Sequence, residues 1–168
     1  MRTCRHGLPT DLTDANAPSP PDHRGDGPGG AGARSAAVES RLGTALPSDY
    51  KLLVETFGCD GLFDEFFHVF TPEELVWHTE VYAGGFVPGG EHPPPFPEAG
   101  GVIPWAGNEN EDRFFWTTGA RDPDDWSVYA LDSLNEGSRF DCTATEFLFR
   151  QMTDASDFRG HWFMRTVG

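Results

Sequence analysis

The first 34 residues of this chain contain no phenylalanine, tyrosine or tryptophan, although the whole chain of 168 residues has 22 of them. They are instead rich in proline, glycine, aspartate and alanine. A segment without large apolar side chains cannot bury enough surface to offset the entropy lost when its backbone is ordered. We therefore expect residues 1–34 to be a disordered tail, or an extension outside the native protein, and residues 35–168 to form one domain.

Cysteine and long apolar runs are also scarce. The three cysteines, Cys4, Cys59 and Cys142, are odd in number and lack C-x-x-C spacing, which excludes a disulfide framework and a cysteine zinc site. The sequence has no run of 18 apolar residues, the length that a membrane-spanning helix needs. No apolar segment of signal-peptide length follows Arg2 and Arg5. These absences favour a cytoplasmic protein.

Positive charge is in short supply. The chain has 12 lysine and arginine residues against 27 aspartate and glutamate residues, a net charge of −15, and the first 34 residues are neutral. The excess therefore belongs to the predicted domain. Such a surface repels nucleic acid and anionic membranes and attracts basic proteins, although acidity that serves solubility alone is the simpler alternative.

Several segments have helical signals. A first short helix is expected around Val38 and Leu42, and a second from Leu46-Pro47 to Gly58, with its apolar face on Tyr50, Leu53, Val54 and Phe57. Thr71 and Glu74 form the pattern of a capping box, with Pro72 at the first helical position. Thr143 and Glu146 repeat this pattern before a last helix, whose inner face we place on Phe147, Leu148 and Met152.

Strand signals alternate with the helical ones. The stretch 61–70 is aromatic and short, which predicts a strand. A loop rich in proline and glycine is expected at residues 84–101. Further strands are expected at 102–105, 113–118, 126–131, 139–140 and 160–167. Turn-rich connections between them predict an antiparallel meander with flanking helices, an α+β fold in a single domain. Apolar residues on both sides of the strand 126–131 predict that both faces of the sheet are covered.

The chemistry of the domain centres on an acidic stretch, "NENED" at 108–112, between two apolar runs. Asn108, Asn110 and Asp112 have the spacing of a calcium loop, but Arg113 and Gly119 stand where that loop needs glycine and glutamate. A turn of this composition is solvated, so we expect no large pKa shift and no catalytic carboxylate.

Other catalytic signatures are missing. The histidines have no H-x-x-x-H or H-E-x-x-H spacing, and neither a nucleophile elbow nor a phosphate-binding glycine loop is present. The sequence therefore predicts a binding protein that is not an enzyme and that uses no metal and no cofactor. We place its partner-binding surface on the loop 106–112 together with the corner 59–65. The candidate residues are Asp60, Asp64, Glu65, Glu109, Glu111 and Asp112.

The order of five segments resembles the SMI1/KNR4 family, also called the SUKH superfamily. They are "LGTALPSDYKLLVETFGCDGLF", "FTPEEL", "GGVIPWAGNENEDRFFWTTG", "DDWSVYALD" and "TATEFLFRQM", and they span roughly residues 36–153. The chain departs from the family pattern at Asn110-Glu111-Asp112, where the family has Asn-Gly-Asp, and in its proline-rich segment 84–101. The missing turn glycine bears on the shape of this hairpin.

The resemblance implies an α+β fold with an antiparallel sheet and no catalytic residues. It also implies a bacterial immunity protein that binds and neutralises a cognate toxin, often a nuclease. Acidic charge agrees with this, because a nuclease is basic where it meets phosphate. A regulatory adaptor in a host protein complex, without a toxin, is the alternative that the resemblance also implies.

Overall fold

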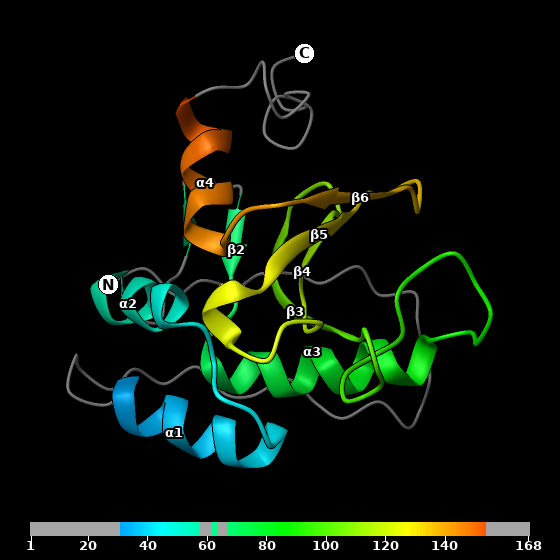
Figure 1. Cartoon of the computed structure of the whole chain (residues 1–168). Coiled ribbons are helices and arrows are strands. Elements are labelled where there is room, and N and C mark those ends of the chain that lie inside the picture. The colour runs from blue at the N-terminus through cyan, green and yellow to red at the C-terminus, as the bar shows by residue number, and fades with distance from the viewer. Residues whose placement is uncertain (1–30, 58–61, 64–66, 154–168) are drawn as a thin grey trace.

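The computed structural model describes residues 31–57, 62–63 and 67–153 (Figure 1). In this part of the chain the helices are α1 (Ala31–Leu42), α2 (Ser48–Phe57), α3 (Pro72–Gly85) and α4 (Ala144–Thr153). The strands are β1 (Leu62–Phe63), β2 (Phe67–Val69), β3 (Val102–Asn108), β4 (Arg113–Thr117), β5 (Ser127–Leu131) and β6 (Gly137–Phe140), and a 3-10 turn, η2 (Pro123–Asp125), precedes β5.

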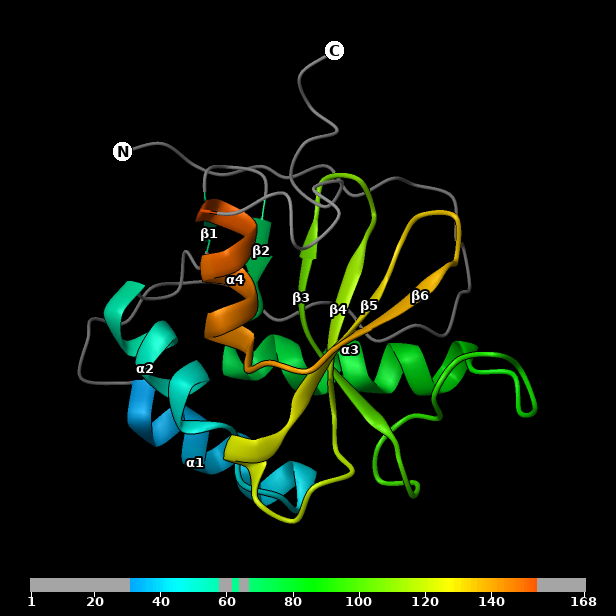
Figure 2. The same cartoon turned by 45° about the horizontal axis from the view of Figure 1, so that its top comes forward.

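The strands form one antiparallel sheet in the order β1-β2-β3-β4-β5-β6, so that every neighbour in the sheet is also a neighbour in sequence. The α+β class and the antiparallel meander predicted from the sequence are thereby confirmed. The β3–β4 and β5–β6 turns lie at one end of the sheet, and the β4–β5 connection lies at the other (Figure 2).

Two sequence expectations were wrong in detail. The described residues of 61–70 form two short antiparallel strands and not one, with Phe63 of β1 paired to Phe67 of β2. Asp64 and Glu65 interrupt the apolar run, and acidic residues are unfavourable inside strands. The first helix begins at Ala31, so residues 31–34 belong to α1 and not to a tail. Residues 1–30 and the strand expected at 160–167 lie outside the described residues.

The capping box at α3 is present as predicted. The Thr71 side chain accepts from the backbone N–H of Glu74, and Glu74 Oε2 accepts from the backbone N–H of Thr71 at 2.7 Å. At α4, Thr143 Oγ1 accepts from Glu146 N, while the Glu146 carboxylate contacts Arg150 one turn later. Met152 was expected inside, yet it is 62% exposed, and Gln151 is buried instead.

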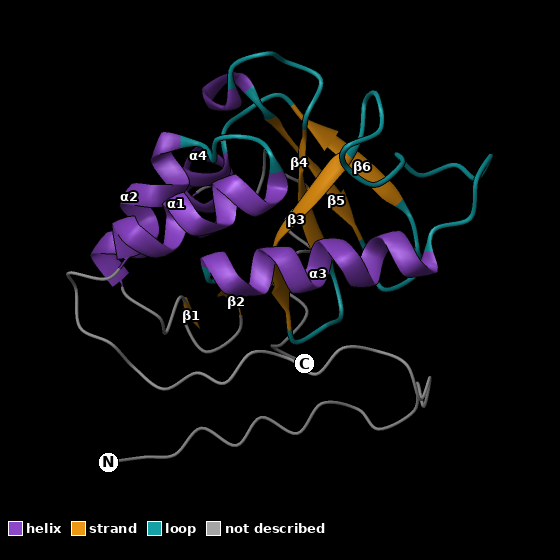
Figure 3. Cartoon of the chain, turned by 90° about the horizontal axis from the view of Figure 1, so that it is seen from below, coloured by secondary structure: helices purple, strands orange, loops and turns teal. Residues whose placement is uncertain are grey.

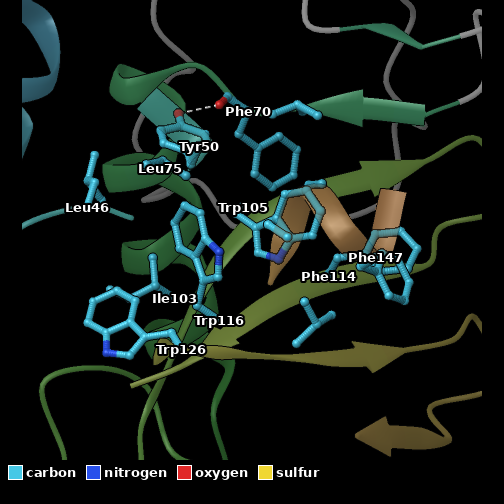
Figure 4. Packing of buried hydrophobic residues seen from close by; sticks show 14 of the residues in the cluster. Leu46, Tyr50, Phe70, Leu75, Ile103, Trp105, Phe114, Trp116, Trp126 and Phe147 are labelled. Carbon is cyan, nitrogen blue, oxygen red and sulfur yellow. Dashed lines mark hydrogen bonds between the residues drawn. The ribbon is translucent and has the colours of Figure 1, made fainter. Parts of the chain in front are cut away.

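One face of the sheet carries the main core (Figure 4). Trp105, Trp116 and Phe114 of the sheet meet Tyr50 of α2 and Phe147 of α4, with Tyr50 and Trp116 edge to face at 5.0 Å between ring centroids. The Tyr50 hydroxyl donates to the Phe70 carbonyl at 2.6 Å. A register shift between Pro104 and Ala106 lets Trp105 and Ala106, adjacent in sequence, both join this core.

The opposite face, which we call the second face, carries another apolar cluster. It consists of Val102, Phe115, Tyr129 and Leu131. Tyr82, from the C-terminal half of α3, packs against it. Seen from below, α1, α2 and α4 gather near one end of α3, and the loop after α3 extends beyond its other end (Figure 3). Both faces of the sheet are therefore apolar and covered, as the alternation in residues 126–131 predicted.

The loop between α3 and β3 has no regular secondary structure but is held by hydrogen bonds. The Tyr82 hydroxyl donates to the Pro93 carbonyl at 2.7 Å, and His92 Nδ1 lies 2.9 Å from the Tyr129 hydroxyl. Where the loop joins β3, a Cβ on Gly101 would lie 2.7 Å from the Glu98 carbonyl oxygen, so the chain can close there only with glycine. The loop thus lies against the second face of the sheet.

Candidate docking surface

The acidic stretch 108–112 forms the turn between β3 and β4. Asn108 organises it, because its Oδ1 accepts from the backbone N–H groups of Asn110 at 3.0 Å and Asp112 at 2.9 Å. Glu111 has φ of 66°, a left-handed conformation that glycine adopts far more readily than other residues. The tight turn therefore forms with glutamate, and not glycine, in this conformation.

The sequence predicts a solvated turn, and this prediction is wrong for Asp112. Its side chain is buried, with 2% exposure. Its Oδ2 accepts from Asn108 Nδ2 at 2.7 Å, and its Oδ1 accepts from the backbone N–H of Ser133 at 3.1 Å. Both oxygens of this carboxylate therefore accept hydrogen bonds that hold the turn, as a buried polar group requires. It ties the β3–β4 turn to the β5–β6 turn, twenty-one residues away in sequence.

The β5–β6 turn is held in a similar way. Asp132, which is 9% exposed, accepts through Oδ1 from the backbone N–H groups of Leu134 at 2.9 Å and Glu136 at 2.8 Å. Asn135 adopts the left-handed conformation with φ of 66°, which asparagine tolerates well. Two inward carboxylates therefore shape two adjoining turns.

We call residues 108–112 and 132–136 together the turn edge. Glu109, Glu111 and Glu136 are exposed on it, and Leu134 between them is 70% exposed. The side chains of Glu109 and Glu111 have no hydrogen bond or ion pair to another described residue, while the Glu111 backbone N–H donates to the Asn108 carbonyl at 3.1 Å. The turn edge thus combines free negative charge and one large apolar side chain on a backbone that is already ordered.

Of the six residues predicted to bind a partner, Glu109 and Glu111 are exposed on the turn edge and Asp112 is buried. The other three, Asp60, Asp64 and Glu65, lie outside the described residues. The ladder pairs Phe67 with Asn108, the first residue of the acidic turn. The β5–β6 turn was missed, although "LDSLNEG" at 131–137 has the aspartate, asparagine and glycine typical of a tight turn after a strand.

The titratable groups with large pKa shifts lie elsewhere and are neutral near pH 7. Burial lowers the pKa of His78 to about 4, and its ring is stacked on Phe70 with 3.6 Å between centroids. Burial raises the pKa of the Cys142 thiol to about 11 and that of Tyr82 to about 12. None of these three groups is suited to exchange a proton at neutral pH.

Over the described ranges, no group of three or more histidine, cysteine, aspartate or glutamate side chains is arranged to hold a metal ion. No helix in the same ranges is long and apolar enough to cross a membrane.

Comparison with known proteins adds no relative to this picture. No protein-family model matches the chain, and no curated protein or solved structure matches it. The geometry of the turn edge is therefore the basis for assigning a function.

Proposed function

We propose that this chain is a cytoplasmic binding protein without enzymatic activity that neutralises a basic toxin, of nuclease type, in the manner of the SMI1/KNR4 immunity proteins. The observation that carries the proposal is the turn edge. There Asp112 joins two turns, and the side chains of Glu109 and Glu111 have no partner within the described part of the chain. The resemblance of the sequence to that family supports the same function.

Pre-organisation favours binding at this edge. A loop that is already ordered loses little conformational entropy when a partner docks on it. Glu109, Glu111 and Glu136 would meet basic side chains of the partner, and Leu134 would lose its contact with water. Charge complementarity of this kind accelerates encounter and excludes acidic partners.

The net charge of −15 acts over a longer range than these contacts. A field of one sign attracts an oppositely charged protein before the two surfaces meet. A nuclease toxin suits this field, because the surface with which it binds phosphate must be positive. An acidic protein that covers that surface blocks access of the nucleic acid.

Affinity capture followed by co-expression tests the proposal. The full chain is immobilised at physiological salt, beside a Glu109→Gln/Glu111→Gln variant and a control, Asp122→Asn/Asp125→Asn, which neutralises two exposed carboxylates at the opposite end of the sheet. We expect a basic protein to be retained by the parent and the control and to be depleted on the turn-edge variant.

The captured protein is then expressed alone and together with this chain. We expect growth arrest in the first case and growth in the second. If cells die equally in both cases, the toxin assignment is wrong. A captured protein that is harmless alone would instead favour the regulatory adaptor.

A further inference from the structure

A pocket of about 420 Å³ opens beside the turn edge, on the second face of the sheet. Apolar side chains make much of its wall: Val81 and Tyr82 of α3, Phe86 and Val87 of the following loop, and Leu131 of β5. Arg113, Glu91, His92 and Asn135 supply its polar groups. Its volume lies within the range of pockets that hold small organic molecules.

The polar groups differ in their availability. Asn135 Nδ2 lies 2.8 Å from His92 Nε2, and His92 Nδ1 lies 2.9 Å from the Tyr129 hydroxyl, so both ring nitrogens are occupied. The Tyr82 hydroxyl donates to the Pro93 carbonyl. These contacts fix the wall of the pocket and leave the two charged side chains, Arg113 and Glu91, to meet a ligand.

Arg113 lies on a strand of the sheet, whereas Glu91 lies on the loop after α3. It begins β4 and pairs with Leu131 of β5, and Phe115, two residues on, pairs with Tyr129. The register therefore puts the Arg113 side chain on the same face as the second apolar cluster. The side chains of Arg113 and Glu91 are both exposed, but only Arg113 lies on a strand.

The charge on Arg113 is not neutralised within the described part of the chain. There Arg34, Arg41, Lys51 and Arg150 each lie within 4.0 Å of a carboxylate, whereas Arg113, Arg121 and Arg139 do not. Of these three, only Arg113 lines the pocket. An unpaired guanidinium in a strongly acidic protein, beside apolar walls, is complementary to a carboxylate that carries an apolar group.

We propose that this pocket binds a small apolar acid, with the carboxylate on Arg113 and the apolar group against Tyr82, Val87 and Leu131. The acid is either a free molecule or the C-terminal carboxylate of a polypeptide, since both present the same chemistry. The inference does not depend on the proposed function, because Glu109 and Glu111 do not line the pocket.

Binding of matched probes to the full chain tests this site. N-acetyl-leucine is compared with N-acetyl-leucinamide, which lacks the charge, and a peptide ending in a free leucine carboxylate is compared with its C-terminal amide. Backbone amide shifts in NMR spectra report both affinity and location. We expect the two acids to shift the resonances of Arg113, Leu131 and Asn135, and each amide to bind roughly tenfold more weakly.

The variants are Arg113→Gln and Arg139→Gln. Arg139 lies on the same face, with its guanidinium carbon 5.5 Å from the centre of the Tyr129 ring, but it does not line the pocket. We expect Arg113→Gln to weaken binding of the acids about tenfold and Arg139→Gln to change it less than about twofold. Unchanged amide spectra away from the pocket show that each variant is folded.

Tighter binding of the peptide than of the free acid identifies a polypeptide end, and the reverse order identifies a small molecule. Equal binding of acids and amides, no binding at millimolar concentration, or parent-like affinity in Arg113→Gln would each overturn the proposal.

Discussion

Glu111 holds a left-handed backbone conformation, with φ of 66° at the tip of the β3–β4 turn. This conformation costs L-amino acids about 1–2 kcal/mol, and glycine adopts it freely. The turn forms because Asn108 and Asp112 supply its hydrogen bonds. The native residue therefore places a charge at the turn edge at some cost in stability.

We expect Glu111→Gly to raise the free energy of unfolding by about 0.5–1 kcal/mol, because relief of the backbone outweighs the added freedom of the unfolded chain. Urea denaturation monitored by tryptophan fluorescence measures it. Glu109→Gly is the matched control, since no positive φ occurs there, and it should lower stability slightly. Equal destabilisation by both changes would contradict the expectation.

His78 predicts a dependence of stability on pH. Its pKa is about 4 in the folded protein because burial disfavours the charged ring, whereas an unperturbed histidine has a pKa of 6.5. Between these values the unfolded chain binds more protons than the folded one, so stability falls as pH falls from 6.5 towards 4. The loss over this window is roughly 2–3 kcal/mol.

Urea denaturation at several pH values between 7 and 4.5 checks this slope. His78→Phe keeps an aromatic ring to stack on Phe70 and cannot titrate. We expect the pH dependence of the variant to be shallower than that of the parent over this window. Parallel curves would show that His78 does not cause the effect.

At the scale of elements, α2 and α4 are joined by one carboxylate. Asp49 in the first turn of α2 accepts through Oδ2 from the backbone N–H of Thr145 at 3.1 Å and from its hydroxyl at 2.8 Å. The same residue favours the N-terminal dipole of its own helix. One side chain thus serves the starts of two helices that are 96 residues apart in sequence.

Asp49→Ala is expected to cost about 1–2 kcal/mol of stability, because it leaves the backbone N–H of Thr145, at the start of α4, without its acceptor. Urea titration measures the loss. Glu55→Ala on the exposed side of α2 is the control and should change stability by less than about 0.5 kcal/mol. An equal effect of the two changes would rule out the link between the helices.

At the scale of the whole molecule, the charge excess predicts how a partner is met. The association rate with a basic partner should fall as ionic strength rises, since salt screens the long-range field. Neutralising Glu109 and Glu111 should lower this rate several-fold at low salt, whereas the Asp122→Asn/Asp125→Asn control removes the same charge at the far end of the sheet and should lower it less.

Stopped-flow or surface-based kinetics at several salt concentrations, with the captured partner, measure these rates. Equal rates for the two variants would mean that net charge alone, and not the turn edge, guides the encounter. The thermal stability of both variants should stay close to that of the parent, because Glu109, Glu111 and Asp125 are exposed and asparagine can replace Asp122 as a cap.

The sequence by itself determined the local features of this fold. Thr71 and Glu74 announce the start of α3 three residues apart, and the turn-rich segments between apolar runs predict a meander, because capping and turn chemistry act over a few residues. Apolar residues on both sides of the strand 126–131 predicted two covered faces, because the side chains of a strand alternate between its faces. The predicted strand ends and the prediction of a single strand at 61–70 were less accurate, since register and pairing depend on neighbouring strands.

Tertiary structure alone decided how distant residues meet. That Asp112 is buried against Ser133 follows from the antiparallel order, which brings two turns to one end of the sheet. The pocket with Arg113 exists because the loop after α3 lies against the second face, and no spacing in the sequence encodes that contact. Such contacts are set by the packing of whole elements, whose energies are summed over many residues.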